Sequence, residues 1–478
     1  GESVSNKGEE AGLSGEDMVL ESTYAIEGPG SFSFFASLRR EQALLGERKT
    51  NRVLSNPEES TSAFRNDRNR VVKNGLKGCV YDLLSSYTGR RPKWGILTGI
   101  RPVKIVHEML DDGCSPAEVR QELQEVYRLH PSKVDLAMKT AEIQRPLIGN
   151  RDNRTVSVYI HIPFCSTRCL YCSFPSDLIR RVSNKIGAYL DCLEREMSTL
   201  SEEFRKRGIS ADTVYIGGGT PTVLEYSDLE RMLGIVESCI TSRFHLLEYT
   251  VEAGRPDSLD PRKLQLLKKY GVTRISINPQ SMNQETLDRV GRSHTVEDVV
   301  RVYRQAREAG FDCINMDVIL GLPGETARHM DRTMEALAAL KPDNITVHTL
   351  AVKRASALKE SFCQYDPSRR GLAEEMAAVC GKWIEKLGMV PYYLYRQKYM
   401  LDHLENVGYT VPGKECLYNI HIMEEKRSIW AFGAGAASKL YHPAEDRLER
   451  IGNVKNLDEY IGRIGEMIEK KRKALRND

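Results

Sequence analysis

Short apolar segments of strand type alternate regularly with amphipathic helical segments between residues 156 and 350. The expected strands cover residues 156–163, 213–216, 249–252, 274–277, 313–320 and 345–350. The expected helices between them cover residues 185–206, 227–241, 261–270, 296–309 and 327–340. Strands that are separated by helices pair in parallel through right-handed crossovers, so the alternation predicts an α/β fold around a parallel sheet.

Polar or glycine-rich residues follow one expected strand after another. They are the cysteine-containing segment 164–174, the segment GGGT at 217–220, Glu252, Gln280, Asp317 and His348. A partial (β/α)6 barrel and an open doubly wound sheet both fit the alternation. Reactive groups of barrels gather at the carboxyl ends of several different strands, so these residues favour the partial barrel.

Three cysteines, Cys165, Cys169 and Cys172, follow the first strand with CxxxCxxC spacing. An odd number of closely spaced thiols does not suit a disulfide framework and is typical of a metal centre. A structural zinc site would need a fourth ligand, for which His161 or a distant cysteine is available. A [4Fe–4S] cluster held by three cysteines would instead keep one iron open to a ligand. Zinc and an iron–sulfur cluster both remain open on the spacing alone.

The composition excludes several classes of function. The 69 Lys and Arg residues nearly balance the 66 Asp and Glu residues, which gives no electrostatic footprint for nucleic acid. The 11 cysteines are spread along the chain in a pattern unlike that of secreted proteins, so we expect a cytoplasmic protein. No stretch approaches the roughly 18 apolar residues of a membrane span, and we expect none.

With 478 residues the chain is long enough for more than one domain. Residues 1–70 are rich in Ser, Glu, Asn, Gly and Arg, and we expect them to be flexible or loosely packed. Residues 71–150 show helical periodicity and predict an N-terminal helical (α+β) domain. We assign residues 151–357 to the partial barrel and 358–478 to a C-terminal domain that covers it, ending in a solvated basic helix end at 469–478.

Six motifs in order resemble those of radical S-adenosylmethionine (SAM) enzymes, and more narrowly those of oxygen-independent coproporphyrinogen III dehydrogenases. They are the CxxxCxxC segment, GGGTP at 217–221, VEAGRPDSL at 251–259, SINPQSM at 276–282, GRSHT at 291–295 and NMDVILGLPGE at 315–325. Two further segments, PKWGILTGIRP at 92–102 and PYYLYRQKYMLDHLENVGY at 391–409, resemble the HemZ-type branch, which carries an extra N-terminal domain.

The resemblance implies a radical SAM partial barrel in which Cys165, Cys169 and Cys172 hold a [4Fe–4S] cluster. It implies that the open iron chelates the methionine moiety of SAM, and it leaves open whether a second SAM molecule binds. The residues that it places around SAM are Tyr159, Phe174, Gly218, Gly219, Thr220, Glu252, Gln280, Arg292, Asp317, Ile319 and Ala351. Tyr159 and His161 are the implied catalytic residues, on one side of the first strand.

The activity that the resemblance implies is the oxidative decarboxylation of two propionates of coproporphyrinogen III to give protoporphyrinogen IX in anaerobic haem biosynthesis. A small electron-transfer protein would then donate electrons. Because the tetrapyrrole is a polyacid, we expect basic residues at the mouth of the site, namely Arg354, Arg396 and Lys398. Three other hypotheses remain: a haem-binding chaperone on the same scaffold, a radical tetrapyrrole methyltransferase, and a structural zinc protein.

Overall fold

The computed structural model describes residues 18–28, 30–41, 43–53, 67–99, 101–148, 154–351 and 370–477. The chain divides into two compact units, residues 1–142 and residues 143–478. None of the described helices combines the length and apolar character needed to span a bilayer.

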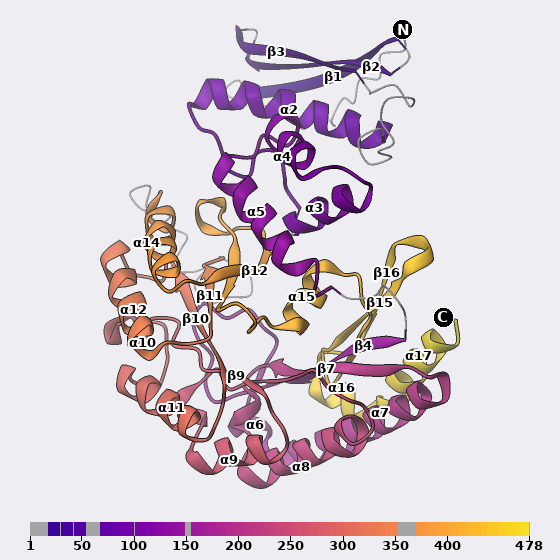
Figure 1. The fold of residues 1–478 in the computed structure, drawn as a ribbon, viewed down its shortest axis with the longest axis vertical. Helices are drawn as coiled ribbons and strands as arrows, with labels where there is room; N and C mark the ends of the chain where they lie inside the picture. Colours follow the sequence, from indigo (N-terminus) through magenta and orange to yellow (C-terminus); the bar gives the residue numbers. More distant parts are fainter. Residues whose placement is uncertain are drawn as a thin grey trace. The chain divides into compact units, whose positions relative to one another are not determined.

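The first unit begins with an antiparallel three-stranded sheet of β1 (Met18–Gly28), β2 (Ser31–Arg40) and β3 (Ala43–Val53) (Figure 1). Phe32, Phe34, Ala36 and Leu38 alternate along β2 and pack against helix α2 (Arg68–Thr88). The prediction of a flexible or loosely packed segment is therefore wrong for the three strands Met18–Gly28, Ser31–Arg40 and Ala43–Val53. The apolar alternation lies in the central strand β2, whereas β1 and β3 carry most of the polar side chains and are largely exposed or half-buried.

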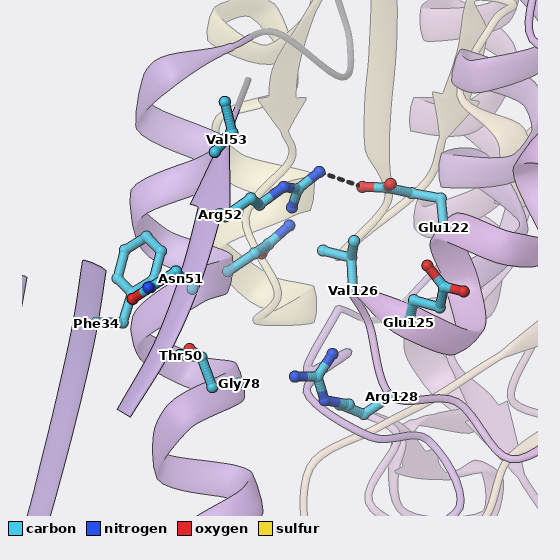
Figure 2. Close-up of a pocket in the computed structure, with 12 residues that line it drawn as sticks. Phe34, Thr50, Asn51, Arg52, Val53, Gly78, Glu122, Glu125, Val126 and Arg128 are labelled. Carbon is cyan, nitrogen blue, oxygen red and sulfur yellow. Dashed lines mark hydrogen bonds and ion pairs between the residues drawn. The ribbon is translucent and has the colours of Figure 1, made fainter. Parts of the chain in front are cut away.

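Three helices complete this unit, in agreement with the helical periodicity expected after residue 70: α3 (Pro102–Asp111), α4 (Pro116–Glu125) and α5 (Pro131–Gln144). Helix α4 begins with a capping box between Ser115 and Glu118. A cavity of about 290 Å³ lies among β3, α2 and α4, where Arg52 donates to Glu122 across 3.0 Å (Figure 2).

The second unit is built on six parallel strands that are neighbours in the sheet in the order of the sequence. They are β4 (Thr155–Ile162), β7 (Ser210–Gly218), β8 (Glu248–Glu252), β9 (Arg274–Ser276), β10 (Cys313–Leu320) and β11 (Asn344–Thr349). The helices α7 (Ile186–Arg207), α8 (Tyr226–Val236), α9 (Pro261–Lys269), α11 (Val296–Glu308) and α12 (Ala327–Leu340) cover the outer face of the strands (Figure 1). The predicted α/β alternation is confirmed.

Alternation along each strand separates an apolar outer face from a polar and aromatic inner face. Val158 and Ile160 of β4 and Val318 of β10 belong to the large apolar core shared with the helices. Tyr159 and Asp317, which occupy the alternate positions, belong to the other face of the sheet. The inner face therefore offers polar groups to a ligand while the outer face holds the fold together.

The region after residue 370 extends the same sheet at both edges instead of forming a separate domain. Its elements are α14 (Leu372–Lys386), β12 (Val390–Tyr395), β13 (Asn406–Thr410), α15 (Leu417–Glu424), β14 (Ile429–Phe432), β15 (Ala437–His442), β16 (Arg447–Gly452), α16 (Leu457–Gly462) and α17 (Ile464–Asn477). Strand β13 pairs antiparallel with β11, and β14 pairs parallel with β4. Both edges of the parallel sheet would otherwise expose unpaired backbone groups, which explains why this region joins the barrel.

Helix α17 contributes a buried charge to this unit, whereas the sequence suggested a solvated basic end. Lys471 is fully buried and contacts Glu196 of α7 across 2.5 Å. Glu196 also accepts from the amide of Gly433 at 2.9 Å and from the hydroxyl of Tyr460 at 2.7 Å. The carboxylate thus joins α7, α16, α17 and the turn after β14.

We predict that Lys471→Met lowers the free energy of unfolding by about 3–5 kcal/mol, because the buried Glu196 carboxylate loses its countercharge. Urea denaturation of the whole chain measures this loss. The exposed Lys473 offers a control, since Lys473→Met should change stability by less than about 0.5 kcal/mol. Adding Glu196→Gln to Lys471→Met should recover part of the loss, and equal losses in the single and double variants would contradict the prediction.

Candidate functional site

The three cysteines lie in the turn that follows β4. Cys165 ends the short strand β5 (Phe164–Cys165), which pairs with β6 (Asp177–Leu178), and the amide of Cys172 donates to the carbonyl of Cys169 at 3.0 Å. Burial raises the pKa of the Cys172 thiol, and the neighbouring Cys169 and Cys165 raise it further. The thiols are therefore close enough to influence one another, as a shared centre requires.

Two hydrogen-bond donors from other elements reach the cysteine sulfurs. The guanidinium of Arg255 lies 3.7 Å from the Cys169 sulfur, and the hydroxyl of Thr220 lies 3.7 Å from the Cys165 sulfur. Arg255 was not among the residues predicted for the site. Its position three residues after Glu252, beyond the end of β8, is the sequence signal that could have identified it.

The glycines after β7 pack directly against the cysteine segment. A Cβ atom on Gly218 would lie 2.0 Å from the His161 ring, and one on Gly219 would lie 2.4 Å from the Phe164 carbonyl oxygen. Gly218 also has a φ of 109°, which other residues rarely adopt. The amide of Gly219 donates to Ile162 and that of Thr220 to Phe164, at 2.8 and 2.7 Å. These glycines are needed for close packing of the two segments.

Glu252, at the end of β8, is held beneath the glycine segment. Its carboxylate accepts from the Tyr215 hydroxyl at 2.7 Å and from the Gly218 amide at 3.3 Å. Burial raises the pKa of Glu252 to about 7, and the negative charge of Asp317 adds to the rise, while both hydrogen bonds oppose it. The group therefore titrates near neutral pH.

Asp317, Gln280 and His348 meet at the ends of β10 and β11. His348 lies 3.5 Å from the Asp317 carboxylate, and it lowers the pKa of Asp317 against the effect of burial, which would raise it. Gln280 has a φ of 66° and its backbone pairs with Val318. Its side-chain oxygen is buried without a hydrogen-bond partner among the described residues, as is that of Asn278. Buried acceptors of this kind suit the hydroxyl or amino groups of a ligand.

Arg292 is buried beside the cysteine segment, in the loop between α10 (Gln284–Arg289) and α11. Its guanidinium donates to the carbonyls of Gly254 and Asn278 at 3.1 and 3.0 Å, and to the Tyr171 hydroxyl at 3.1 Å. Tyr171 was also missed, because its contact with Arg292 joins parts of the chain that are distant in sequence.

Tyr159 and His161 lie on the same face of β4, with ring centroids 6.1 Å apart. Tyr159 also contacts Tyr418, which in turn stacks on Tyr215 at 4.4 Å. Burial lowers the pKa of His161, and its Nδ1 atom hydrogen-bonds the Ala434 carbonyl oxygen. A donating Nδ1 leaves Nε2 as the acceptor atom of a neutral ring.

The other predicted residues differ in how they are placed. Ile319 is buried at the end of β10, and Ala351 is half-buried and bridges to Met400. Phe174 is 61% exposed and does not line the interior. Arg396 and Lys398 follow β12, where Arg396 is half-buried and donates to His403 and Lys398 is exposed. Arg354 lies outside the described residues.

Comparison with known proteins places this site in a class. Residues 159–337 match the model of the Radical SAM superfamily. The structure of the coproporphyrinogen III oxidase HemN of Escherichia coli, a radical SAM enzyme, has the same fold, with a TM-score of 0.53 at 22% identity over 69% of this chain and 73% of that chain. The fold is therefore a radical SAM partial barrel, as predicted.

Two curated relatives narrow the class. The chain is 39% identical over 408 residues to the oxygen-independent coproporphyrinogen-III oxidase-like protein HemZ of Bacillus subtilis, covering 85% of this chain and 81% of the relative. It is 30% identical over 312 residues to the haem chaperone HemW of the same organism, covering 65% and 76%. The chain belongs to the radical SAM family that includes HemZ, HemW and HemN.

The superfamily implies a [4Fe–4S] cluster and SAM, and the described residues fit both. No three His, Cys, Asp or Glu side chains of the described residues converge on a position for one metal ion. A cluster does not require such convergence, because each cysteine binds a different iron. The donors at the Cys165 and Cys169 sulfurs suit thiolates, and the buried acceptors of Asn278 and Gln280 suit a polar ligand beside them.

We predict that the Glu252→Gln variant removes a pH dependence of stability. The unfolded chain releases the Glu252 proton near pH 4.5, whereas the folded chain keeps it to about pH 7. The folded state therefore binds more protons in this window, and the wild type loses stability as pH rises, by at most about 1.4 kcal/mol per pH unit.

Urea denaturation of the metal-free chain at about pH 5 and about pH 7 measures the difference. The exposed Glu285 provides a matched control, because Glu285→Gln should keep the slope of the wild type. A Glu252→Gln variant with the same slope as the wild type would contradict the prediction.

Proposed function

We propose that this protein oxidatively decarboxylates two propionates of coproporphyrinogen III to form protoporphyrinogen IX. The observation that supports the proposal is that the cysteine segment and the strand-end polar groups lie together in a chain 39% identical to a coproporphyrinogen-III oxidase-like relative. When bound, a reduced [4Fe–4S] cluster and SAM would supply a 5′-deoxyadenosyl radical able to remove a hydrogen atom from the β-carbon of a propionate. Release of CO₂ and transfer of one electron to an external one-electron acceptor would then leave a vinyl group.

Cys165, Cys169 and Cys172 would hold the cluster. The amide hydrogens of Gly219 and Thr220 are already donated to the chain, so the amino group of SAM would meet carbonyl oxygens of this segment. Carbonyl oxygens accept hydrogen bonds, so they can bind an amino group, which donates them.

The polar groups at the other strand ends would hold the rest of SAM. Arg292 would bind its carboxylate, because the guanidinium lies in the loop beside the cysteine segment. Asp317 and Gln280 would accept from the ribose hydroxyls, since Asp317 is ionised and Gln280 has a buried side-chain oxygen with no hydrogen-bond partner among the described residues. Glu252 would lie at the polar end of the ligand, while Ile319, Ala351 and, after movement of its exposed ring, Phe174 would contact the adenine.

Tyr159 and His161 would face the reacting centre from the first strand. The neutral His161 ring packs against Gly218. The Tyr159 ring contacts the rings of Tyr215 and Tyr418. Aromatic side chains exclude water from the space where a radical would form. We assign Tyr159 to holding the substrate and His161 to the cluster environment or a proton relay.

The substrate would enter where β12 ends. Strand β12 runs antiparallel to β13, which runs antiparallel to β11, so β12 ends at the same edge of the sheet as β11. Arg396 and Lys398 follow the last residue of β12 at this edge. We propose that they and Arg354 bind the propionates of the substrate. We further propose a cytoplasmic location, a small electron-transfer protein as donor and room for a second SAM molecule.

A haem chaperone is the second candidate function, because the chain covers 76% of a HemW relative at 30% identity. Such a protein would bind haem in a stoichiometric complex and would form no vinyl product. The two functions therefore differ in the mass of the tetrapyrrole after the reaction, which falls only if carboxyl groups are lost.

We predict that the anaerobically reconstituted protein, given coproporphyrinogen III, SAM and a reductant, removes two carboxyl groups from the tetrapyrrole. Mass analysis of the tetrapyrrole measures the loss. Cys169→Ala should lose both the cluster and at least about 100-fold of the activity, because one iron loses its ligand. Cys239→Ala is the matched control, since this buried cysteine lies on the outer side of the barrel core and should leave the cluster intact.

Unchanged coproporphyrinogen with haem bound at one per chain would favour the chaperone. Addition of a methyl group would favour a methyltransferase. A colourless protein that takes up neither iron nor sulfide would contradict the proposed radical chemistry itself.

A further inference from the structure

Arg255 brings a positive charge into direct contact with a cysteine of the proposed cluster. Its side chain is 4% exposed, and its Nη1 atom lies 3.7 Å from the Cys169 sulfur. Arg292 is also near Cys169, but its guanidinium donates hydrogen bonds to the Tyr171 hydroxyl and to the carbonyls of Gly254 and Asn278. The two arginines therefore have separate contacts, and Arg255 is the one that touches the sulfur.

Every nitrogen of the Arg255 guanidinium is held in place. Nη1 also donates to the Thr167 carbonyl at 3.2 Å, Nη2 donates to the Ser293 hydroxyl at 3.3 Å, and Nε donates to the Asp257 carboxylate at 3.2 Å. A guanidinium with all its nitrogens engaged has little freedom to turn, so its orientation toward the sulfur is fixed.

Asp257 binds the Nε atom of the guanidinium, whereas Nη1 is the atom that reaches the sulfur. Burial would raise the pKa of Asp257, but the interactions with His294 and Arg255 hold it well below its usual range. His294 is buried behind the carboxylate at 3.7 Å, and the Ser166 hydroxyl donates to Asp257 at 3.2 Å. The carboxylate is therefore ionised and orients Arg255 through a nitrogen other than the one that contacts the sulfur.

The position of Arg255 has a consequence for a redox centre bound by Cys169. The reduction potential of an iron–sulfur cluster depends on net charge, on hydrogen bonds to its sulfurs and on exposure to solvent. Adding an electron makes the cluster more negative, so a hydrogen bond from a guanidinium to a ligand sulfur stabilises the reduced state more than the oxidised state, even though Asp257 offsets part of the charge of Arg255.

We propose that Arg255, oriented by Asp257, is a positioning residue that raises the reduction potential of the cluster through the Cys169 thiolate. This inference rests on the cluster of the proposed function, but it does not depend on the tetrapyrrole substrate. It gives Arg255 a role in the acceptance of the electron that starts the reaction.

The test uses the full chain after anaerobic reconstitution, with Arg255→Met, Arg255→Lys and the exposed control Arg301→Met on α11. Iron and sulfide content, the electron paramagnetic resonance signal of the reduced cluster and a mediated redox titration are measured for each. Circular dichroism and thermal unfolding establish that the variants are folded.

At the potential where the wild-type cluster is half reduced, Arg255→Met should lower the ratio of reduced to oxidised cluster about tenfold, which is about 59 mV for one electron. Arg255→Lys keeps the charge and should change this ratio less than about threefold, although it loses the planar fork. Arg301→Met should match the wild type.

A folded Arg255→Met variant with the wild-type ratio would overturn the proposal. So would folded Arg255→Met and Arg255→Lys variants that take up no cluster, because Arg255 would then only anchor the cysteine loop. Wild-type protein that binds no cluster would overturn both this inference and the proposed function. Wild-type protein that binds a cluster and converts no tetrapyrrole would overturn the proposed reaction alone, and the titration would still decide the role of Arg255.

Discussion

The pairing of β4 between two parallel neighbours is the constraint on which the rest of this site depends. β7 pairs along one edge of β4 and β14 along the other, so the ends of all three strands meet. His161 is held between them: Gly218 touches its ring from the β7 side, and the turn after β14 supplies the Ala434 carbonyl oxygen from the other. The cysteine segment leaves from the end of this central strand, so its position is fixed by backbone pairing on both sides.

Burial has a different effect on each charged group around this strand. Glu252 is buried with neutral donors and a neighbouring negative charge, so its pKa rises toward 7. Asp317 is equally enclosed, but His348 and Asn315 hold it ionised. Two carboxylates on the inner face of one sheet thus differ in charge at neutral pH. The difference follows from the partner of each carboxylate and is independent of its depth.

The sequence predicted the elements whose pattern is local. Each parallel strand was placed to within a few residues, because an apolar run between two helices has a clear length and period. The sheet of residues 18–53 was missed, because its strands carry many charged residues on one face and only β2 shows a strong apolar alternation. The burial of Lys471 was missed for a related reason. A lysine among other basic residues gives no sign in the sequence that it forms an ion pair with the distant Glu196.

The same distinction explains which residues of the proposed site the sequence indicates and which contacts only the structure reveals. The cysteines, the glycines and Glu252 lie in motifs whose spacing indicates the chemistry, so the sequence alone predicts a site there, and their roles stay predictions. Arg255 and Tyr171 lie inside the same motifs, but their importance comes from partners on other elements: the Cys169 sulfur for one and Arg292 for the other. The inner ring of such a site can therefore be predicted from its motifs, whereas the residues that set its charge become visible only when the fold brings the motifs together. Arg255 and Arg292 are buried charges beside the cysteines in the part of the chain that the structure describes, and the proposed centre, which would have to accept an electron, would gain from them.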